Sequence, residues 1–96
     1  MSAPIITQFV WEGVRVEISY KKHHHGDPDF DHIELRVERG RIIPVTETGY
    51  RSHFLQTAFV EVYDGPEGYV RAWLDNEAQS PDWRKRAEAA RQLSLF

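Results

Sequence analysis

The chain has 96 residues, no cysteine and a formal net charge of −3. This length suits a single domain with a modest core, and the absence of cysteine excludes disulfides and thiolate zinc sites. The negative charge argues against a protein that wraps nucleic acid through many phosphate contacts. No run approaches the roughly 18 apolar residues of a membrane-spanning helix. The N-terminus also lacks a signal-peptide pattern. We therefore expect a cytoplasmic protein that does not associate with membranes.

Alternating side chains predict β-strands in the N-terminal half. Residues 14–20 alternate between apolar and polar side chains, which is the period of a half-buried strand. The β-branched and aromatic run at residues 5–11 lies before it, with Glu12-Gly13 between the two runs, so a hairpin is expected. A third strand follows at 33–37. A short strand or edge strand is expected at 42–45, because Pro44 cannot donate a hydrogen bond to a sheet.

The segments between these strands read as turns and loops. Residues 21–31 contain Gly26 and Pro28 and have neither strand nor helix period, so they are expected to form a polar connector. The aspartates of this connector predict a solvated acidic patch; they are Asp27, Asp29 and Asp31. Residues 38–41 predict a second turn.

Helical signals dominate the C-terminal half. Pro66 suits a first helical position, and apolar residues then recur on one face; they are Tyr69, Val70, Trp73, Leu74 and Ala78. Ser80 and Pro81 predict the capped start of another helix. Residues 55–63 fit either a strand or a short helix ended by Gly65, and we favour the helix. The three tryptophans, Trp11, Trp73 and Trp83, lie in apolar-periodic segments and are expected in the core.

Together these elements predict an α+β fold of two layers. A small antiparallel sheet of three to four strands (residues 5–45) is followed by two to three helices (residues 55–92) that cover one face. Residues 1–91 are expected to form this single domain, and residues 92–96 a flexible peptide.

The most specific motif is the pentapeptide Gln92-Leu93-Ser94-Leu95-Phe96. A fixed Gln, two Leu and a Phe at a chain end should arise by chance in roughly one chain in several tens of thousands. The pentapeptide resembles the peptides by which many bacterial polymerases and repair factors dock on the β sliding clamp. The rest of the chain resembles small bacterial proteins with the same ending, which assigns no activity.

The resemblance implies a role for each residue of the pentapeptide. Gln92 would orient the peptide at the pocket mouth, and Ser94 would be a tolerant spacer. The apolar subsites would be filled by Leu93, Leu95 and Phe96. The alternative is that these three side chains fold back on the domain and seal its own core.

A basic stretch precedes the pentapeptide and consists of Arg84, Lys85, Arg86 and Arg91. A clamp encircles DNA, so a tethered basic helix would lie near phosphates. We favour an ordinary solvated helix face, because four charges are too few for strong binding to nucleic acid.

Residues 46–54 hold the densest mixture of polar and aromatic side chains. The candidates for binding a ligand or phosphate are Thr48, Tyr50, Arg51 and His53. An enzymatic or nucleic-acid-processing domain centred on them is the alternative function. We favour a strand-to-helix turn, with Gly49 at an unusual backbone angle and Ser52 as a helix cap.

The His-rich loop offers weak metal-ligand candidates: His23, His25 and His32. Adjacent residues of an extended loop point in alternating directions, so consecutive histidines rarely converge on one ion. We therefore expect no metal and no cofactor. The function predicted from the sequence is a non-enzymatic accessory of DNA replication or repair, which docks on the clamp as an adaptor or as a regulator of access.

Overall fold

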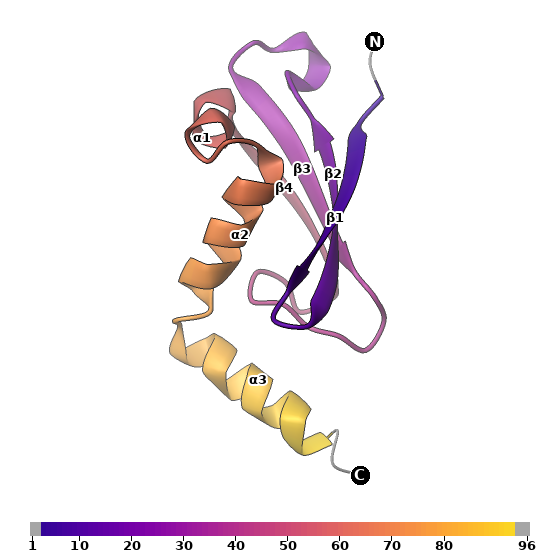
Figure 1. Ribbon diagram of the computed structural model, residues 1–96, viewed down its shortest axis with the longest axis vertical. Helices are drawn as coiled ribbons and strands as arrows, with labels where there is room; N and C mark the ends of the chain where they lie inside the picture. Colours follow the sequence, from indigo (N-terminus) through magenta and orange to yellow (C-terminus); the bar gives the residue numbers. More distant parts are fainter. Residues whose placement is uncertain (1–2, 94–96) are drawn as a thin grey trace.

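The computed structural model describes residues 3–93. Its elements, in chain order, are β1 (Ile5–Trp11), β2 (Val14–Lys21), the 3-10 turn η1 (His24–Gly26), β3 (Phe30–Val37), β4 (Tyr50–Gln56), α1 (Thr57–Val62), α2 (Pro66–Glu77) and α3 (Pro81–Leu93). The strands form one antiparallel sheet in the order β1-β2-β3-β4. Helices follow on one side (Figure 1), which confirms the predicted α+β class.

The β1–β2 hairpin forms where the alternating pattern predicted it. Its two turn residues, Glu12 and Gly13, both have positive φ (44° and 81°), as a tight two-residue hairpin turn requires. The register pairs Phe9 with Val16 and Trp11 with Val14, so the apolar side chains of both strands share one face.

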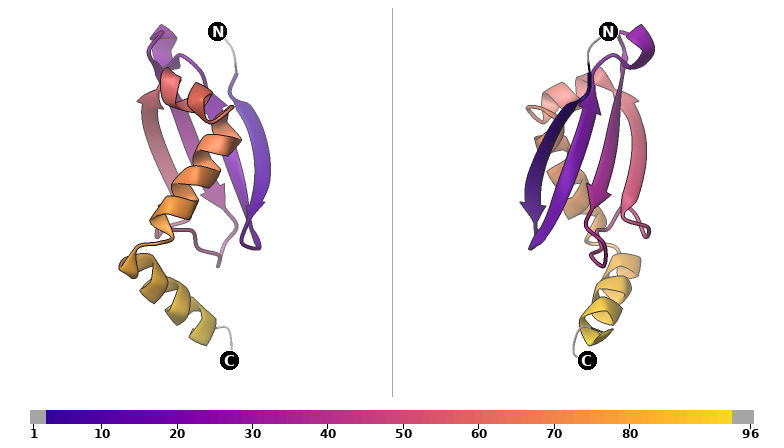
Figure 2. Two further views of the ribbon diagram at one scale, coloured as in Figure 1. Left: turned by 60° about the vertical axis from the view of Figure 1, so that its left-hand side comes forward. Right: turned by 90° about the vertical axis from the view of Figure 1, so that its right-hand side faces the viewer.

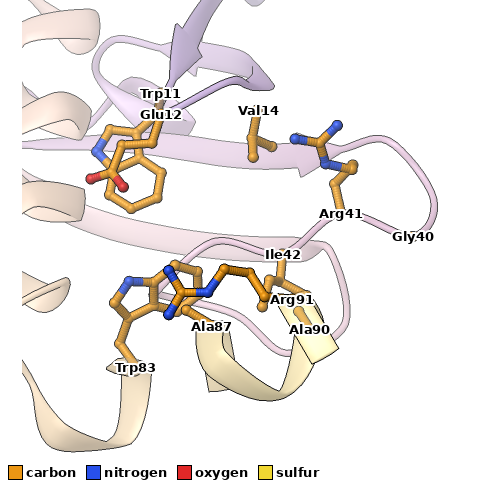
Figure 3. A pocket seen from close by; sticks show the side chains of 10 residues that line it. All are labelled: Trp11, Glu12, Val14, Gly40, Arg41, Ile42, Trp83, Ala87, Ala90 and Arg91. Carbon is orange, nitrogen blue, oxygen red and sulfur yellow. The ribbon is translucent and has the colours of Figure 1, made fainter. Parts of the chain in front are cut away.

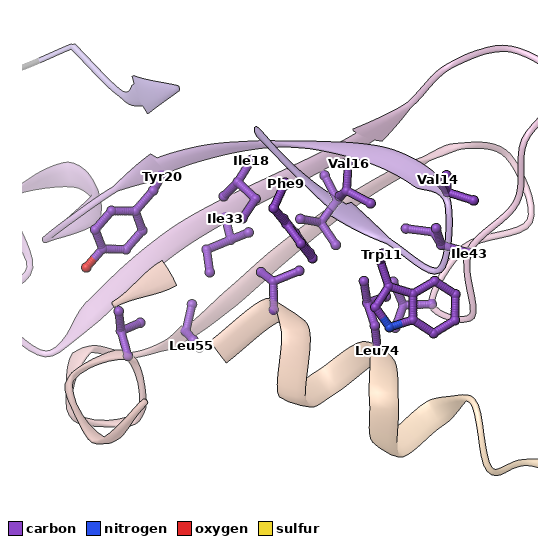
Figure 4. Packing of buried hydrophobic residues seen from close by; sticks show 14 of the residues in the cluster. Phe9, Trp11, Val14, Val16, Ile18, Tyr20, Ile33, Ile43, Leu55 and Leu74 are labelled. Carbon is purple, nitrogen blue, oxygen red and sulfur yellow. The ribbon is translucent and has the colours of Figure 1, made fainter. Parts of the chain in front are cut away.

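The covered face of the sheet holds the core (Figure 4). Val16 and Ile18 from β2 and Ile33 and Leu35 from β3 are all fully buried. Helix α2 crosses this face, and its Val70 and Leu74 are likewise inaccessible to solvent. No helix of residues 3–93 covers the opposite face of the sheet (Figure 2, right). Successive strand residues point to opposite faces, so the uncovered face carries the other half of each strand.

The fourth strand lies later in the chain than the sequence predicted. β4 occupies Tyr50–Gln56 and pairs with β3, so the sheet extends to residue 56 and not 45. The predicted strand at 42–45 is wrong, because this segment makes only an isolated bridge between Ile43 and Thr46. Its apolar side chains are nonetheless buried as a loop that closes one end of the core. Gly49, at φ 88°, then leads into β4.

The helices begin where the sequence signals placed them. Of residues 55–63, for which a helix was favoured, Leu55 and Gln56 belong to β4 and Thr57–Val62 form α1. The Gly65 N–H closes the end of α1 by donating to the Val60 carbonyl at 2.9 Å. α2 starts at Pro66 and α3 at Pro81. The Ser80 hydroxyl accepts a hydrogen bond from the Trp83 N–H at 3.1 Å, which confirms the predicted cap.

Asp31 corrects the prediction of a solvated acidic patch. It belongs to β3, and its side chain is fully buried on the covered face. Its carboxylate accepts hydrogen bonds from the Tyr20 hydroxyl (2.5 Å), the Thr57 hydroxyl (2.6 Å) and the His23 N–H (2.9 Å). The carboxylate therefore ties β2, β3, the His-rich loop and the start of α1 together at one end of the sheet.

Candidate functional site

Helix α3 presents the basic stretch and the start of the pentapeptide. It is attached to the domain near its beginning, where Trp83 packs edge-on against Trp11 with ring centroids 5.8 Å apart. The Trp11 indole N–H in turn donates to the Asp75 carboxylate of α2 at 2.8 Å. These contacts bind the start of α3, the end of α2 and the tip of the β1–β2 hairpin into one aromatic corner.

Arg86 strengthens this attachment from the other side of α3. Its guanidinium donates to the backbone carbonyls of Pro44 (2.7 Å) and Thr46 (3.3 Å) and lies 5.2 Å from the centre of the Trp83 ring. Its Nε atom lies 3.4 Å from the Asp82 carboxylate. Only 19% of the Arg86 side chain is exposed, so this residue holds the buried 42–45 loop and does not join a basic surface.

The other three basic residues of α3 are exposed. Arg84 and Arg91 are seven residues apart and lie on the same side of the helix, whereas Lys85 points about 100° away. Arg91 is ion-paired with Glu88. Arg84 and Arg91 thus share one side of α3, about two turns apart, whereas Arg86 lies on the other side.

The pentapeptide begins inside α3, because this helix continues to Leu93. Gln92 is exposed. Ser94, Leu95 and Phe96 lie outside the described residues, so the predicted docking peptide is described only at its start. The expected boundary between residues 91 and 92 falls within the last helical turn.

A groove of about 480 Å³ runs between α3 and the tip of the β1–β2 hairpin (Figure 3). Its apolar lining includes Trp11, Trp83, Ile42 and Ala87, and Arg41 and Arg91 also line it. No sequence pattern pointed to this groove, because its walls come from three segments that are distant in the chain.

The candidate ligand-binding segment at 46–54 does not converge on one site, because it runs into β4. Tyr50 lies on the uncovered face, where its hydroxyl donates to Glu34 at 2.5 Å. Arg51 and His53 lie on the covered face against Trp73, with separations of 5.7 Å and 4.3 Å to its ring centre. Strand alternation therefore separates Tyr50 from the other two residues.

The remaining members of that segment have structural roles. The Thr46 and Thr48 hydroxyls both donate to the Tyr50 carbonyl, at 2.7 and 3.2 Å, and so hold the turn before β4. Ser52 is not a helix cap, because it lies within β4 and its hydroxyl is 2.7 Å from the Nε2 atom of His32.

His53 is half-buried between the sheet and α2. Its Nε2 atom lies 3.1 Å from the Tyr69 hydroxyl. Burial, aided by the nearby positive charge of Arg51, lowers the pKa of His53 below its ordinary value. The neutral imidazole is therefore the form that the fold favours.

We expect His53 to make the protein less stable in mild acid. Its pKa is lower in the folded chain than in the unfolded chain, so the unfolded chain binds more protons below about pH 6.5. The melting temperature should fall from pH 7.5 to pH 5, and H53F, which keeps a ring against Trp73, should show a shallower fall. Calorimetry across this pH range measures the difference. Identical slopes for both proteins would show that His53 does not titrate between the two states.

The His-rich loop does not bring its three metal-ligand candidates together. The His23 backbone is bonded to Asp31, and the ring of His24, which was not a candidate, lies between those of His25 and His32 at centroid separations of 3.9 and 5.0 Å. Burial and the neighbouring His25, His32 and Lys21 lower the pKa of His24. Among residues 3–93, no group of three or more His, Cys, Asp or Glu has the arrangement of a metal site.

The structure defines a class of protein: a small two-layer α+β domain in which a four-stranded antiparallel meander is backed by helices on one face. Residues 4–83 match the family model of the KlcB third domain, and the chain therefore belongs to that family. The match ends before the basic stretch and the pentapeptide. No curated protein and no solved structure matches the chain. Within the described part of the chain, no helix is long and apolar enough to span a membrane.

Proposed function

We propose that this chain docks on the bacterial β sliding clamp through residues 92–96 and serves DNA replication or repair as an adaptor or as a regulator of access to the clamp. The observation that carries the proposal is the pentapeptide Gln92-Leu93-Ser94-Leu95-Phe96 itself. Gln92 would hydrogen-bond at the mouth of the clamp pocket, and the three apolar side chains would fill its subsites.

The position of α3 supports this role. Trp83, Arg86 and Ala87 attach α3 to the domain. Gln92 is exposed, about 14 Å beyond Trp83 and about 9 Å beyond Arg86 along the helix axis. The pentapeptide also lies beyond the segment that matches the family model. The domain can therefore keep its own contacts while the peptide engages a partner.

The affinity expected for such a peptide is moderate. Burying a Leu or Phe side chain contributes about 1.5–3 kcal/mol, but ordering the peptide and losing rigid-body freedom offset much of this gain. We expect a dissociation constant in the micromolar range, about −7 to −9 kcal/mol. The exposed Arg84 would lie near any DNA that the clamp encircles, which adds a contact that weakens with salt.

A titration of purified clamp with the full chain tests the proposal. F96A should weaken binding at least about thirtyfold, because a buried aromatic anchor is lost. The free energy of unfolding should change by less than about 0.5 kcal/mol. The matched control is F59A, which removes an exposed phenylalanine on α1 and should leave binding to the clamp unchanged.

Two results would contradict this function. Wild-type affinity in F96A would mean that the pentapeptide does not dock. A large loss of stability in F96A would mean that the apolar side chains belong to the domain's own core. We propose no catalytic function, since β4 places Tyr50 and His53 on opposite faces of the sheet.

A further inference from the structure

The uncovered face of the sheet carries exposed aromatic side chains. Phe54 and Tyr50 from β4 expose 57% and 42% of their surface, and Phe30 at the start of β3 exposes 42%. The β3–β4 register places Phe54 opposite His32 and Tyr50 opposite Arg36. The helices lie behind the sheet when this face is viewed (Figure 2, right). The exposed fractions of the three rings show that they face solvent.

Phe54 is the centre of an ordered stack. Its ring is nearly parallel to that of His32, with a centroid separation of 4.4 Å and an angle of 21°. The hydrogen-bonding contact of 2.7 Å between the His32 Nε2 atom and the Ser52 hydroxyl fixes the imidazole in this orientation. His24 contacts the Phe54 ring edge-on at 5.0 Å. A flat π surface is therefore held in place before any ligand arrives.

The same face carries three basic side chains, from Arg15, Lys21 and Arg36. Its acidic side chains are Glu17, Glu34 and, just past the end of β3, Glu38, which is itself paired with Arg41 at 3.8 Å. Glu34 is already engaged by the Tyr50 hydroxyl at 2.5 Å and by Arg36 at 3.7 Å. Arg36 also lies over the Tyr50 ring, 5.1 Å from its centre. A guanidinium thus lies beside Tyr50, and Lys21 is in register with His32 and Phe54 across the sheet.

We propose that this face binds single-stranded nucleic acid. Unpaired bases stack on exposed aromatic rings whatever their sequence, and Phe54 offers such a ring. Basic side chains attract the phosphates that link those bases. Tyr50 and Phe54 are four residues apart on β4, roughly 13 Å. That spacing lets two bases of one extended strand stack along β4 while its phosphate backbone runs beside them over β3, on the side of the basic residues of β2.

The chemistry of the face favours this ligand over a protein. The middle of the face is charged, with Glu17 and Arg36 in register on adjacent strands, and the exposed apolar residues Ile6 and Val10 are confined to β1 at its edge. An apolar protein surface would have to desolvate these groups without pairing them, which is costly. A single strand leaves them hydrated and pairs its phosphates with the basic ones.

Fluorescence anisotropy of the full chain with labelled oligothymidylate and oligouridylate of roughly a dozen nucleotides tests the proposal. Both single strands should bind at low salt, and a duplex of the same length should bind more weakly because its bases are not free to stack. The DNA and RNA arms show which single strand this face prefers.

A pair of phenylalanine variants isolates the stacking. F54A should weaken binding of the preferred strand at least about fivefold, from the loss of one stacked base. F59A removes an equally exposed ring from α1, in the helical layer, and should have no effect. In nuclear magnetic resonance, the His32 ring signals should shift on binding to the wild type.

A double charge variant isolates the phosphate contacts. R15A/K21A should flatten the dependence of log affinity on log salt by about 1.4, the loss expected for two phosphate contacts. R71A, on α2, is the matched control and should leave the salt dependence unchanged.

The proposal is overturned if the wild type binds no single strand at low salt, if duplex binds as well as single strands, or if F54A and F59A behave alike. None of these measurements uses the clamp. A negative result for single-strand binding therefore does not contradict clamp docking, and a negative result for clamp docking does not contradict single-strand binding.

Discussion

Replacing Asp31 by alanine should lower the free energy of unfolding by about 3 kcal/mol or more. The carboxylate is fully buried and accepts hydrogen bonds from Tyr20, Thr57 and the His23 backbone. Removing it leaves three hydrogen-bond donors without a partner. Each donor that stays buried away from water lowers the free energy of unfolding by about 1–3 kcal/mol. The total free energy of unfolding of a domain of this size is only about 5–15 kcal/mol. Urea unfolding followed by circular dichroism measures the loss.

Two further variants separate this network from a general effect of charge. D29A removes an exposed aspartate two residues away and should change stability by less than about 0.5 kcal/mol. D31N keeps one acceptor oxygen and should fall between the wild type and D31A. Equal stability of D29A and D31A would show that the buried carboxylate contributes nothing.

The shifted pKa of Asp31 makes the contribution of this hydrogen-bond network to stability depend on pH in acid. Burial alone would raise this pKa, but the donors from Thr57, Tyr20 and the His23 backbone together hold it below its ordinary value. The contribution to stability is fully present above about pH 4 and is lost as the pH falls through the folded value. Burial, followed by the hydrogen bond to Asp31, raises the pKa of the Tyr20 hydroxyl, so this group remains a donor.

Gly68→Ala should destabilise the protein by about 2 kcal/mol or more, although alanine is the better helix former by about 1 kcal/mol. An added Cβ at this position would lie 2.0 Å from the backbone carbonyl oxygen of Tyr63 and 3.2 Å from its carbonyl carbon. A backbone group cannot rotate away as a side chain does. The link between α1 and α2 would therefore have to shift. The midpoint of urea unfolding reports the loss.

The control for this crowding is Asn76→Ala, an exposed position near the end of α2. It should leave stability unchanged or raise it slightly, because helix propensity alone acts there. A rise in stability for G68A as well would mean that the α1–α2 link has room for a methyl group.

Where burial follows a simple period, the sequence was sufficient to predict the fold. The alternation at 14–20 gave β2, and the helical spacing of Val70 and Leu74 gave the buried side of α2. Ser80 and Pro81 fixed the start of α3 within one residue. These signals are local, because each element carries its own pattern.

β4 escaped prediction because its inward-facing side chains are mostly polar. Arg51 and His53 point to the covered face but pack against Trp73, so the strand lacks an apolar alternation. The segment Ile42–Val45 gave the opposite error, because it was predicted to be a strand and is a loop. It is apolar because a loop is buried there, and its Ile43 and Pro44 carbonyls accept hydrogen bonds from Arg86, 43 and 42 residues away in the chain.

The candidate sites also differ in whether a single segment of the sequence encodes them. The pentapeptide is contiguous, so its sequence alone suggests a partner. The Phe54–His32 stack depends on the pairing of β3 with β4, which no single segment encodes. Asp31 shares the parity of Ile33 and Leu35, and this was the one sequence signal that it points inward.

β1 is an outer strand of the sheet and contains no charged side chain. Ile5, Ile6 and Val10 on it are all more than half exposed. Outer strands usually bear a lysine, a proline or a bulge that discourages another chain from pairing with them. Without such protection within the strand, the outer edge of β1 is a template onto which a fifth strand can be added.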